Sequence, residues 1–227
     1  MNIEEVIEKC EISLKQIKQY EPDPFYVNYF FDQYISLRDK IIAGIFEEAD
    51  KNFELFLTKS VIEENFQQKA KLKNDENTIK FSEWFRAKYI EEHQNLYPNL
   101  MSEICNFRKK FGKLPDVKIM IRASDRYKDD INLEIHVPLK NKKLRSKNEL
   151  DIEIKRQSPV FLEIINYKRH ERNEPKVKNN QIRVSTFLDV KNHKYVEIVY
   201  TAETYIPVIK RLVEESRIKI KDLIKKK

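Results

Sequence analysis

The chain has 227 residues, of which 41% are hydrophobic, 11% aromatic and 36% charged. This composition is typical of a folded protein with a buried core and excludes a largely disordered chain. No apolar run approaches the length that crosses a bilayer, and the 2 glycines argue against a glycine-rich phosphate-binding loop.

The positive charge is concentrated in the second half of the chain. The formal net charge is +7, with −4 over residues 1–112 and +11 over residues 113–227. A basic region attracts phosphates or acidic partners, although exposed lysines also simply keep a protein in solution. The N-terminus lacks the basic start of a signal peptide, and Cys10 and Cys105 lie in apolar helical stripes. We therefore expect a cytoplasmic protein without a disulfide, a metal site or a cofactor.

Helical periodicity predicts a bundle over residues 1–112. Apolar side chains recur at helical spacing over residues 2–19, and Asp23 and Pro24 are suited to cap and begin a second helix that reaches about Ala49. This second helix is apolar around more than one face. It is therefore expected at the centre of the bundle, with self-association into a homo-oligomer through the remaining apolar surface.

The segment from Gly112 to Pro115 separates helical from strand periodicity. Gly112 suits the left-handed residue that follows a helix, and Pro115 prevents the helix from continuing. Alternation of apolar and polar residues beyond it predicts an antiparallel meander of about six strands. The expected strands cover residues 117–121, 131–137, 150–154, 160–167, 182–190 and 195–200.

A final helix is expected from Thr204 to Ile224, with Pro207 in its first turn. Its apolar stripe is expected to cover one face of the sheet. The whole chain is therefore predicted to be an α+β fold, in which a helical bundle (residues 1–112) packs tightly on a sheet with a C-terminal helix (residues 113–227).

The polar side of the predicted sheet is the first candidate site. In the predicted register the following charged side chains share it: Glu134, His136, Asp151, Glu153, Lys155, Arg183, Asp189 and Glu197. Carboxylates beside an imidazole can hold a divalent cation or transfer protons. The alternative is a solvated sheet face with cross-strand ion pairs, which alternation alone produces and which we favour.

A shorter pattern lies within this set. Pro115-Asp116, followed by Glu153-Ile154-Lys155, resembles the Pro-Asp…(Asp/Glu)-x-Lys signature of a nuclease superfamily. The resemblance implies that Asp116 and Glu153 hold a metal ion and that Lys155 stabilises the attacking water or the developing charge. The predicted topology departs from that family, because Lys155 leads through Ser158-Pro159 directly into another strand.

The helical half carries a second resemblance. Trp84 on one helix, and Asn106-Phe107-Arg108-Lys109-Lys110 on the helix that closes the bundle, are similar to HEPN-type domains. Active members of that family cut RNA as dimers with an arginine and a histidine on one helix. Arg86 and His93 have a permitted spacing, but Ala87 stands where a polar residue is expected. Arg108 could take the arginine position, but no histidine follows it within reach. The resemblance therefore implies a helical fold and a dimer rather than a complete RNase site.

Two basic connections form the third candidate site. Their members are Lys140, Lys142, Lys143, Arg145 and Lys147 in one, and Lys168, Arg169, Arg172, Lys176 and Lys178 in the other. If both connections leave the same edge of the sheet, they could clamp a phosphate backbone, and Tyr167 and His170 could stack on bases. The alternative is that both are solvated loops.

These observations favour a binding or assembly module over an enzyme. Nucleic acid or an acidic protein is the expected partner of the basic connections. A nuclease, through Arg86 and His93 or through Asp116, Glu153 and Lys155, is the alternative. A purely structural role is the third hypothesis.

Overall fold

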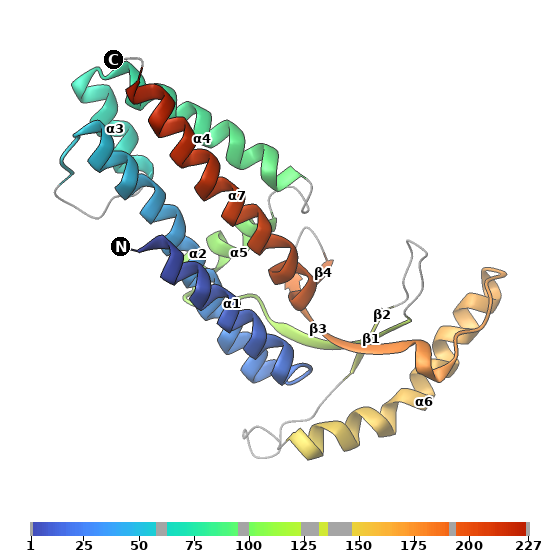
Figure 1. Cartoon of the computed structure of the whole chain (residues 1–227). Coiled ribbons are helices and arrows are strands. Elements are labelled where there is room, and N and C mark those ends of the chain that lie inside the picture. Colours follow the sequence, from blue (N-terminus) through green and yellow to red (C-terminus); the bar gives the residue numbers. More distant parts are fainter. Residues whose placement is uncertain are drawn as a thin grey trace.

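The structure is a computed structural model that describes residues 2–57, 63–94, 100–123, 132–135, 147–190 and 194–225. These residues form seven α-helices, a short 3-10 helix and four strands (Figure 1). In chain order the elements are α1 (Ile3–Tyr20), α2 (Pro24–Phe53), α3 (Glu63–Lys73), α4 (Glu76–Gln94), α5 (Leu100–Phe111), β1 (Val117–Ala123), β2 (Asn132–Ile135), α6 (Lys147–Glu171), η1 (Asn179–Gln181), β3 (Ile182–Val190), β4 (Lys194–Glu197) and α7 (Ile198–Ile224).

Helix α1 matches its predicted range to within one residue, and α2 begins at the predicted Pro24 but continues four residues beyond the predicted end, to Phe53. The Asp23 carboxylate accepts hydrogen bonds from the backbone N–H groups of Phe25 and Tyr26, so it caps α2, and Pro24 is the first helical residue. Gly112 follows α5 with φ +68°, the left-handed conformation that glycine adopts without steric cost.

The C-terminal helix α7 lies within the helical bundle and does not cover one face of the sheet, contrary to the prediction from its apolar stripe. It packs mainly against α1, α2 and α4, with smaller contacts to β3 and β4 (Figure 1). At its start the hydroxyl of Tyr34, on α2, donates a 3.0 Å hydrogen bond to the carbonyl of Ala202. The larger of two hydrophobic cores therefore joins side chains from both sides of Gly112. Most apolar side chains of α2 are buried in this core, which accounts for its broad apolar surface by packing within one chain.

The four described strands form an antiparallel sheet in the order β2-β1-β3-β4. Helix α6 packs against β1 and β2, at the end of the sheet far from the bundle (Figure 1). The second, smaller core lies between them, and its fully buried members are Ile119, Ile121, Ile135, Leu150, Ile165 and Val177. We call β1, β2, α6 and the first half of β3 the sheet lobe.

The prediction of about six strands is wrong, because residues 150–154 and 160–167 belong to the single helix α6. Leu150, Ile154, Phe161 and Ile165 contribute to the smaller core, and their spacing of four, seven and four residues follows a helical stripe. Apolar and polar residues alternate over residues 150–154 as in a strand, but the longer pattern of buried residues is helical. Pro159 lies inside the helix and does not form the expected hairpin.

The predicted strand over residues 195–200 is also too long. Strand β4 ends at Glu197, and α7 begins at Ile198, six residues before the predicted cap Thr204. Ile198, Ala202 and Tyr205 are buried at helical spacing, so one face of the first turns of α7 packs into the larger core. The Thr204 hydroxyl donates to the carbonyl of Tyr200, a bond within the helix, so Thr204 is not its cap.

Among the described helices, none combines the length and the apolar composition that crossing a membrane requires.

Candidate nucleic-acid interface

Most of the described arginines form ion pairs with acidic side chains, and two do not. Eight of the ten form ion pairs, namely Arg38, Arg86, Arg108, Arg122, Arg156, Arg169, Arg211 and Arg217. Within the described ranges, Arg172 and Arg183 form none, and both are exposed. Arg172 directly follows α6, and Arg183 is the second residue of β3. Among the described arginines, these two guanidinium groups are therefore the ones available to an external anion.

Four exposed cations surround the end of α6, and we call them the basic tip: Lys168, Arg172, Lys176 and Lys178. In the part of the chain that the structure describes, none of the four forms an ion pair. All were predicted as members of the second basic connection, but Lys168 lies in the last turn of α6 rather than in a loop.

Hydrogen bonds fix the backbone of the basic tip. Asn166 and Val177 exchange two of them, from Asn166 Nδ2 to the Val177 carbonyl (3.1 Å) and from the Val177 N–H to Asn166 Oδ1 (2.7 Å). Arg169 is buried, and its Nε donates to the carbonyl of Pro175 (2.7 Å) while its guanidinium pairs with Glu174 (3.5 Å). Arg169 therefore holds the turn and is not part of the exposed surface.

Two exposed rings adjoin the basic tip. Tyr167 is 65% exposed, and a hydrogen bond from its hydroxyl to Glu171 raises the pKa of this phenol. His170 is exposed one turn further along α6. Such rings offer flat faces on which bases can stack.

The other predicted basic connection cannot be compared with the basic tip. Lys140, Lys142, Lys143 and Arg145 lie outside the described residues. Lys147 begins α6, and its side chain is also outside them.

The HEPN-like candidates lie apart from the basic tip. Arg86, on α4, is exposed, and its Nε lies 3.7 Å from a Glu63 carboxylate oxygen. His93 belongs to α4, but its side chain is outside the described residues. Arg108 pairs with Asp32 (2.5 Å) and donates to the Ser36 hydroxyl (2.6 Å), so it fastens α5 to α2.

Two residues of the nuclease-like pattern were predicted on a strand but are part of a helix. Glu153 and Lys155 lie on α6, and the Glu153 carboxylate accepts hydrogen bonds from Arg156 (2.5 Å) and Gln157 (2.6 Å). Asp116 precedes β1 and pairs with Lys113 (3.2 Å). Among the residues that the structure describes, no group of three histidine, cysteine or acidic side chains could hold a metal ion.

The polar face of the sheet carries cross-strand ion pairs. The pairing of the strands places Glu134, Arg183, Asp189 and Glu197 on one face, as predicted. Asp151, Glu153 and Lys155 are on α6 instead, and His136 is outside the described residues. Lys118 pairs with Glu134 (3.1 Å) and Arg122 with Glu197 (2.6 Å), which are cross-strand ion pairs of the expected kind. Met120, Ser185 and Phe187 lie on the same face and are buried, so this face is solvated only in part.

A cavity of about 600 Å³ lies at the open edge of β3, where β4 ends and α7 begins. We call it the sheet-edge cavity. Glu21, which follows α1, is part of its wall and accepts hydrogen bonds from the Thr186 N–H (2.9 Å) and hydroxyl (3.1 Å). Burial, with a contribution from Glu197 and Glu203, raises the pKa of this carboxyl above 4.5.

The raised pKa of Glu21 predicts a pH-dependent effect of Glu21→Gln. The folded chain binds the proton more tightly than the unfolded chain, so the ionised carboxylate costs stability as the pH rises through the folded pKa, above 4.5. The amide oxygen of glutamine can still accept from Thr186. Relative to the native chain, we expect Glu21→Gln to be more stable at pH 7 than at pH 4, measured by urea unfolding at both pH values. If the difference in unfolding free energy between Glu21→Gln and the native chain is the same at both pH values, the raised pKa of Glu21 is contradicted.

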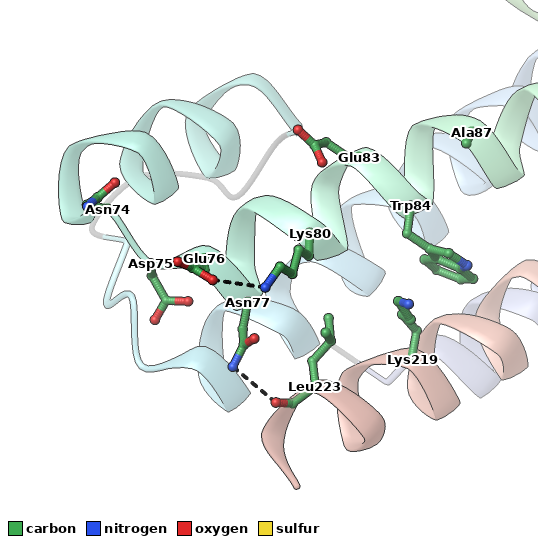
Figure 2. Close-up of a pocket in the computed structure, with 10 residues that line it drawn as sticks. All are labelled: Asn74, Asp75, Glu76, Asn77, Lys80, Glu83, Trp84, Ala87, Lys219 and Leu223. Carbon is green, nitrogen blue, oxygen red and sulfur yellow. Dashed lines mark hydrogen bonds and ion pairs between the residues drawn. The ribbon is translucent and has the colours of Figure 1, made fainter. Parts of the chain in front are cut away.

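Another cavity, of about 980 Å³, lies between α4, the turn that precedes it and the end of α7 (Figure 2). The Asn77 side-chain amide donates to the Leu223 carbonyl (3.1 Å), and Lys80 pairs with Glu76 (2.9 Å). Figure 2 shows Trp84 and Lys219 on the two facing helices. The contact between Asn77 and Leu223 fastens the end of α7 to α4.

Sequence reasoning missed a polar network inside the bundle. Arg38, on α2, is buried and contacts the hydroxyl groups of Tyr89 and Tyr205. The signal was present, because Arg38 continues the apolar spacing of Tyr34, Ile41 and Ile45 on the most apolar helix.

Comparisons of the chain with protein-family models, with curated proteins and with solved structures found no match.

Proposed function

We propose that the protein is a non-enzymatic module that binds nucleic acid through its phosphate backbone, with the basic tip as the contact surface. The observation that carries the proposal is the arginine pairing: eight of ten described arginines have acidic partners, whereas Arg172 does not. A guanidinium group binds a phosphate with two parallel hydrogen bonds, and the three lysines of the tip add point charges.

The position of the basic tip supports contact with an extended polymer. It lies at the end of α6, on the sheet lobe, where α6 reaches away from the bundle (Figure 1). Its backbone is held by the Asn166–Val177 pair, so the cations are displayed from an ordered turn and less entropy is lost on binding.

The chemistry of the tip favours affinity over sequence selectivity. Lysine and arginine contacts to phosphates carry no sequence information, whereas stacking on Tyr167 would favour single-stranded or unpaired bases. Binding should therefore be steeply salt-dependent and should tolerate many sequences.

Neutralising the basic tip tests the proposal. In Lys168→Gln/Arg172→Gln/Lys176→Gln/Lys178→Gln, called the tip variant, we expect roughly a hundredfold weaker binding of a labelled 20-nucleotide RNA at about 0.1 M salt, from four lost phosphate contacts. Fluorescence anisotropy measures the affinity. All four side chains are exposed, so thermal unfolding should be little changed.

The matched control removes four exposed lysines from the bundle: Lys9, Lys15, Lys40 and Lys51, each changed to glutamine. This bundle variant has the same net charge as the tip variant. It should bind RNA within about threefold of the native chain, because its lysines are not at the proposed surface. If both variants lose the same RNA affinity, net charge alone explains the binding and the tip is not a specific surface. If the tip variant loses no RNA affinity, the proposed surface is refuted.

A further inference from the structure

Two arginines on neighbouring strands lie directly opposite each other, and both line the sheet-edge cavity. Arg122 on β1 is paired in register with Arg183 on β3, so both side chains emerge on the same face. Like charges directly opposite each other in an antiparallel pair destabilise the sheet. Glu197 offsets the charge of Arg122 at 2.6 Å, but Arg183 has no ion pair within the described chain. An external anion would remove this repulsion.

The other charged groups of the cavity already have partners. Glu197 pairs with Arg122, Glu203 with Lys18, and Glu21 accepts from Thr186. Arg183 is thus the one charged group of the described lining that lacks a partner. A ligand needs an anionic group for Arg183, and its own donors can complete the hydrogen bonding of the glutamates.

The wall formed by α7 adds two further features. Tyr200 lines the cavity and is 52% exposed, so its ring can cover a flat ligand. Val199 also lines it, and the Glu197 side chain makes no capping hydrogen bond to the N–H groups at the start of α7. Anions are favoured at the positive end of a helix, which here adjoins Arg183 and Arg122.

We infer that the sheet-edge cavity binds a single nucleotide, with its phosphate at Arg183 and Arg122, its base against Tyr200, and its hydroxyl or amino groups directed to Glu21. The choice of a nucleotide rests on the proposed nucleic-acid function, and the lining supplies a partner for each part of it. In a bound strand, this nucleotide would be one unit of the polymer, held at a site separate from the basic tip.

Titration with AMP, inorganic phosphate and adenosine tests the inference. Amide and arginine Nε–H signals of the ¹⁵N-labelled full chain should shift saturably with AMP at Arg183, Ser185 and Tyr200. AMP should bind more tightly than phosphate or adenosine, because it uses both the arginines and the ring. Arg183→Gln should weaken AMP binding by at least about tenfold, the effect of losing a charge-assisted hydrogen bond.

The tip variant separates this site from the proposed function. It should bind AMP like the native chain, whereas Arg183→Gln should lose AMP binding and keep most of the RNA affinity supplied by the tip. RNA binding without AMP binding would overturn the cavity assignment alone. AMP binding with no RNA binding would overturn the proposed function alone. Equal affinity for phosphate and AMP, or an unchanged AMP affinity in Arg183→Gln, would refute the nucleotide assignment.

Discussion

Replacing Arg38 with alanine is expected to lower the free energy of unfolding by about 3 kcal/mol, because the guanidinium joins four helices in the interior. Arg38 is 9% exposed on α2. Its Nε donates to the Tyr205 hydroxyl on α7 (3.1 Å), and its Nη atoms donate to Asp39 (2.7 Å), to the Tyr89 hydroxyl on α4 and to Cys105 Sγ on α5 (3.5 Å).

The physical cost of Arg38→Ala comes from the groups that lose their donor. Burial alone would lower the pKa of Arg38, but Tyr205, Cys105 and Asp39 raise it above its ordinary value, so the side chain stays charged. Without it, the buried Tyr205 hydroxyl loses its charged partner and a cavity remains. Arg38→Lys keeps the charge but cannot reproduce the fork of donors, so an intermediate loss is expected.

Urea unfolding of the native chain, Arg38→Ala and Arg38→Lys measures this effect. Arg86→Ala is the control, because that arginine is exposed and its one ion pair among the described residues, with Glu63, is long, so its loss should stay below about 0.5 kcal/mol. A loss below about 1 kcal/mol in Arg38→Ala would show that the network does not stabilise the bundle.

Replacing Phe46 with alanine should cost about 4 kcal/mol. Phe46 is 0% exposed at the centre of an aromatic cluster, with ring centroids 5.2 Å from Phe66, 6.1 Å from Phe81 and 4.8 Å from Phe85. These contacts join α2 to α3 and α4, so the truncation leaves a cavity where three helices meet and removes favourable edge-to-face contacts.

Phe25→Ala is the matched control for Phe46→Ala. Both phenylalanines belong to α2, but Phe25 is 50% exposed near the start of the helix. We expect Phe25→Ala to cost less than about 1 kcal/mol in the same urea unfolding measurement. If the two substitutions cost the same, the assignment of Phe46 to the centre of the core would be contradicted.

Local chemical signals made the helical half predictable. Asp23 caps the start of α2 with its side chain, and Pro24 has the fixed φ of a first helical residue. Gly112 adopts the left-handed conformation after α5, and Pro115 prevents the helix from continuing. Strands β1 and β3 were predicted because their apolar residues alternate over long enough stretches. Such signals need no knowledge of the rest of the fold.

The sequence misled where a short alternation fits two structures. Leu150, Ile152 and Ile154 alternate like a strand, but only Leu150 and Ile154 contribute to the smaller core, while Ile152 is exposed. Which face is buried depends on the sheet beneath α6, and a window of five residues holds no information about that partner. Tertiary packing likewise decided that α7 begins at Ile198.

The candidate interface was predictable by residue type but not by geometry. Lys168, Arg172, Lys176 and Lys178 were expected as exposed cations, and they are exposed. Arg169 belongs to the same run in the sequence, yet it is buried against Pro175 and Glu174. Net charge cannot separate an arginine that holds a turn from one that faces solvent; that distinction requires the hydrogen-bond partners.

The salt dependence of RNA binding tests the central claim most directly, because it counts phosphate contacts independently of overall affinity. For single strands the slope of log Kobs against log salt concentration is about −0.7 for each phosphate contact. The account predicts that the tip variant has a slope shallower by about 3 than the native chain, and that the bundle variant keeps the native slope. Equal slopes in the native chain and the tip variant would contradict it.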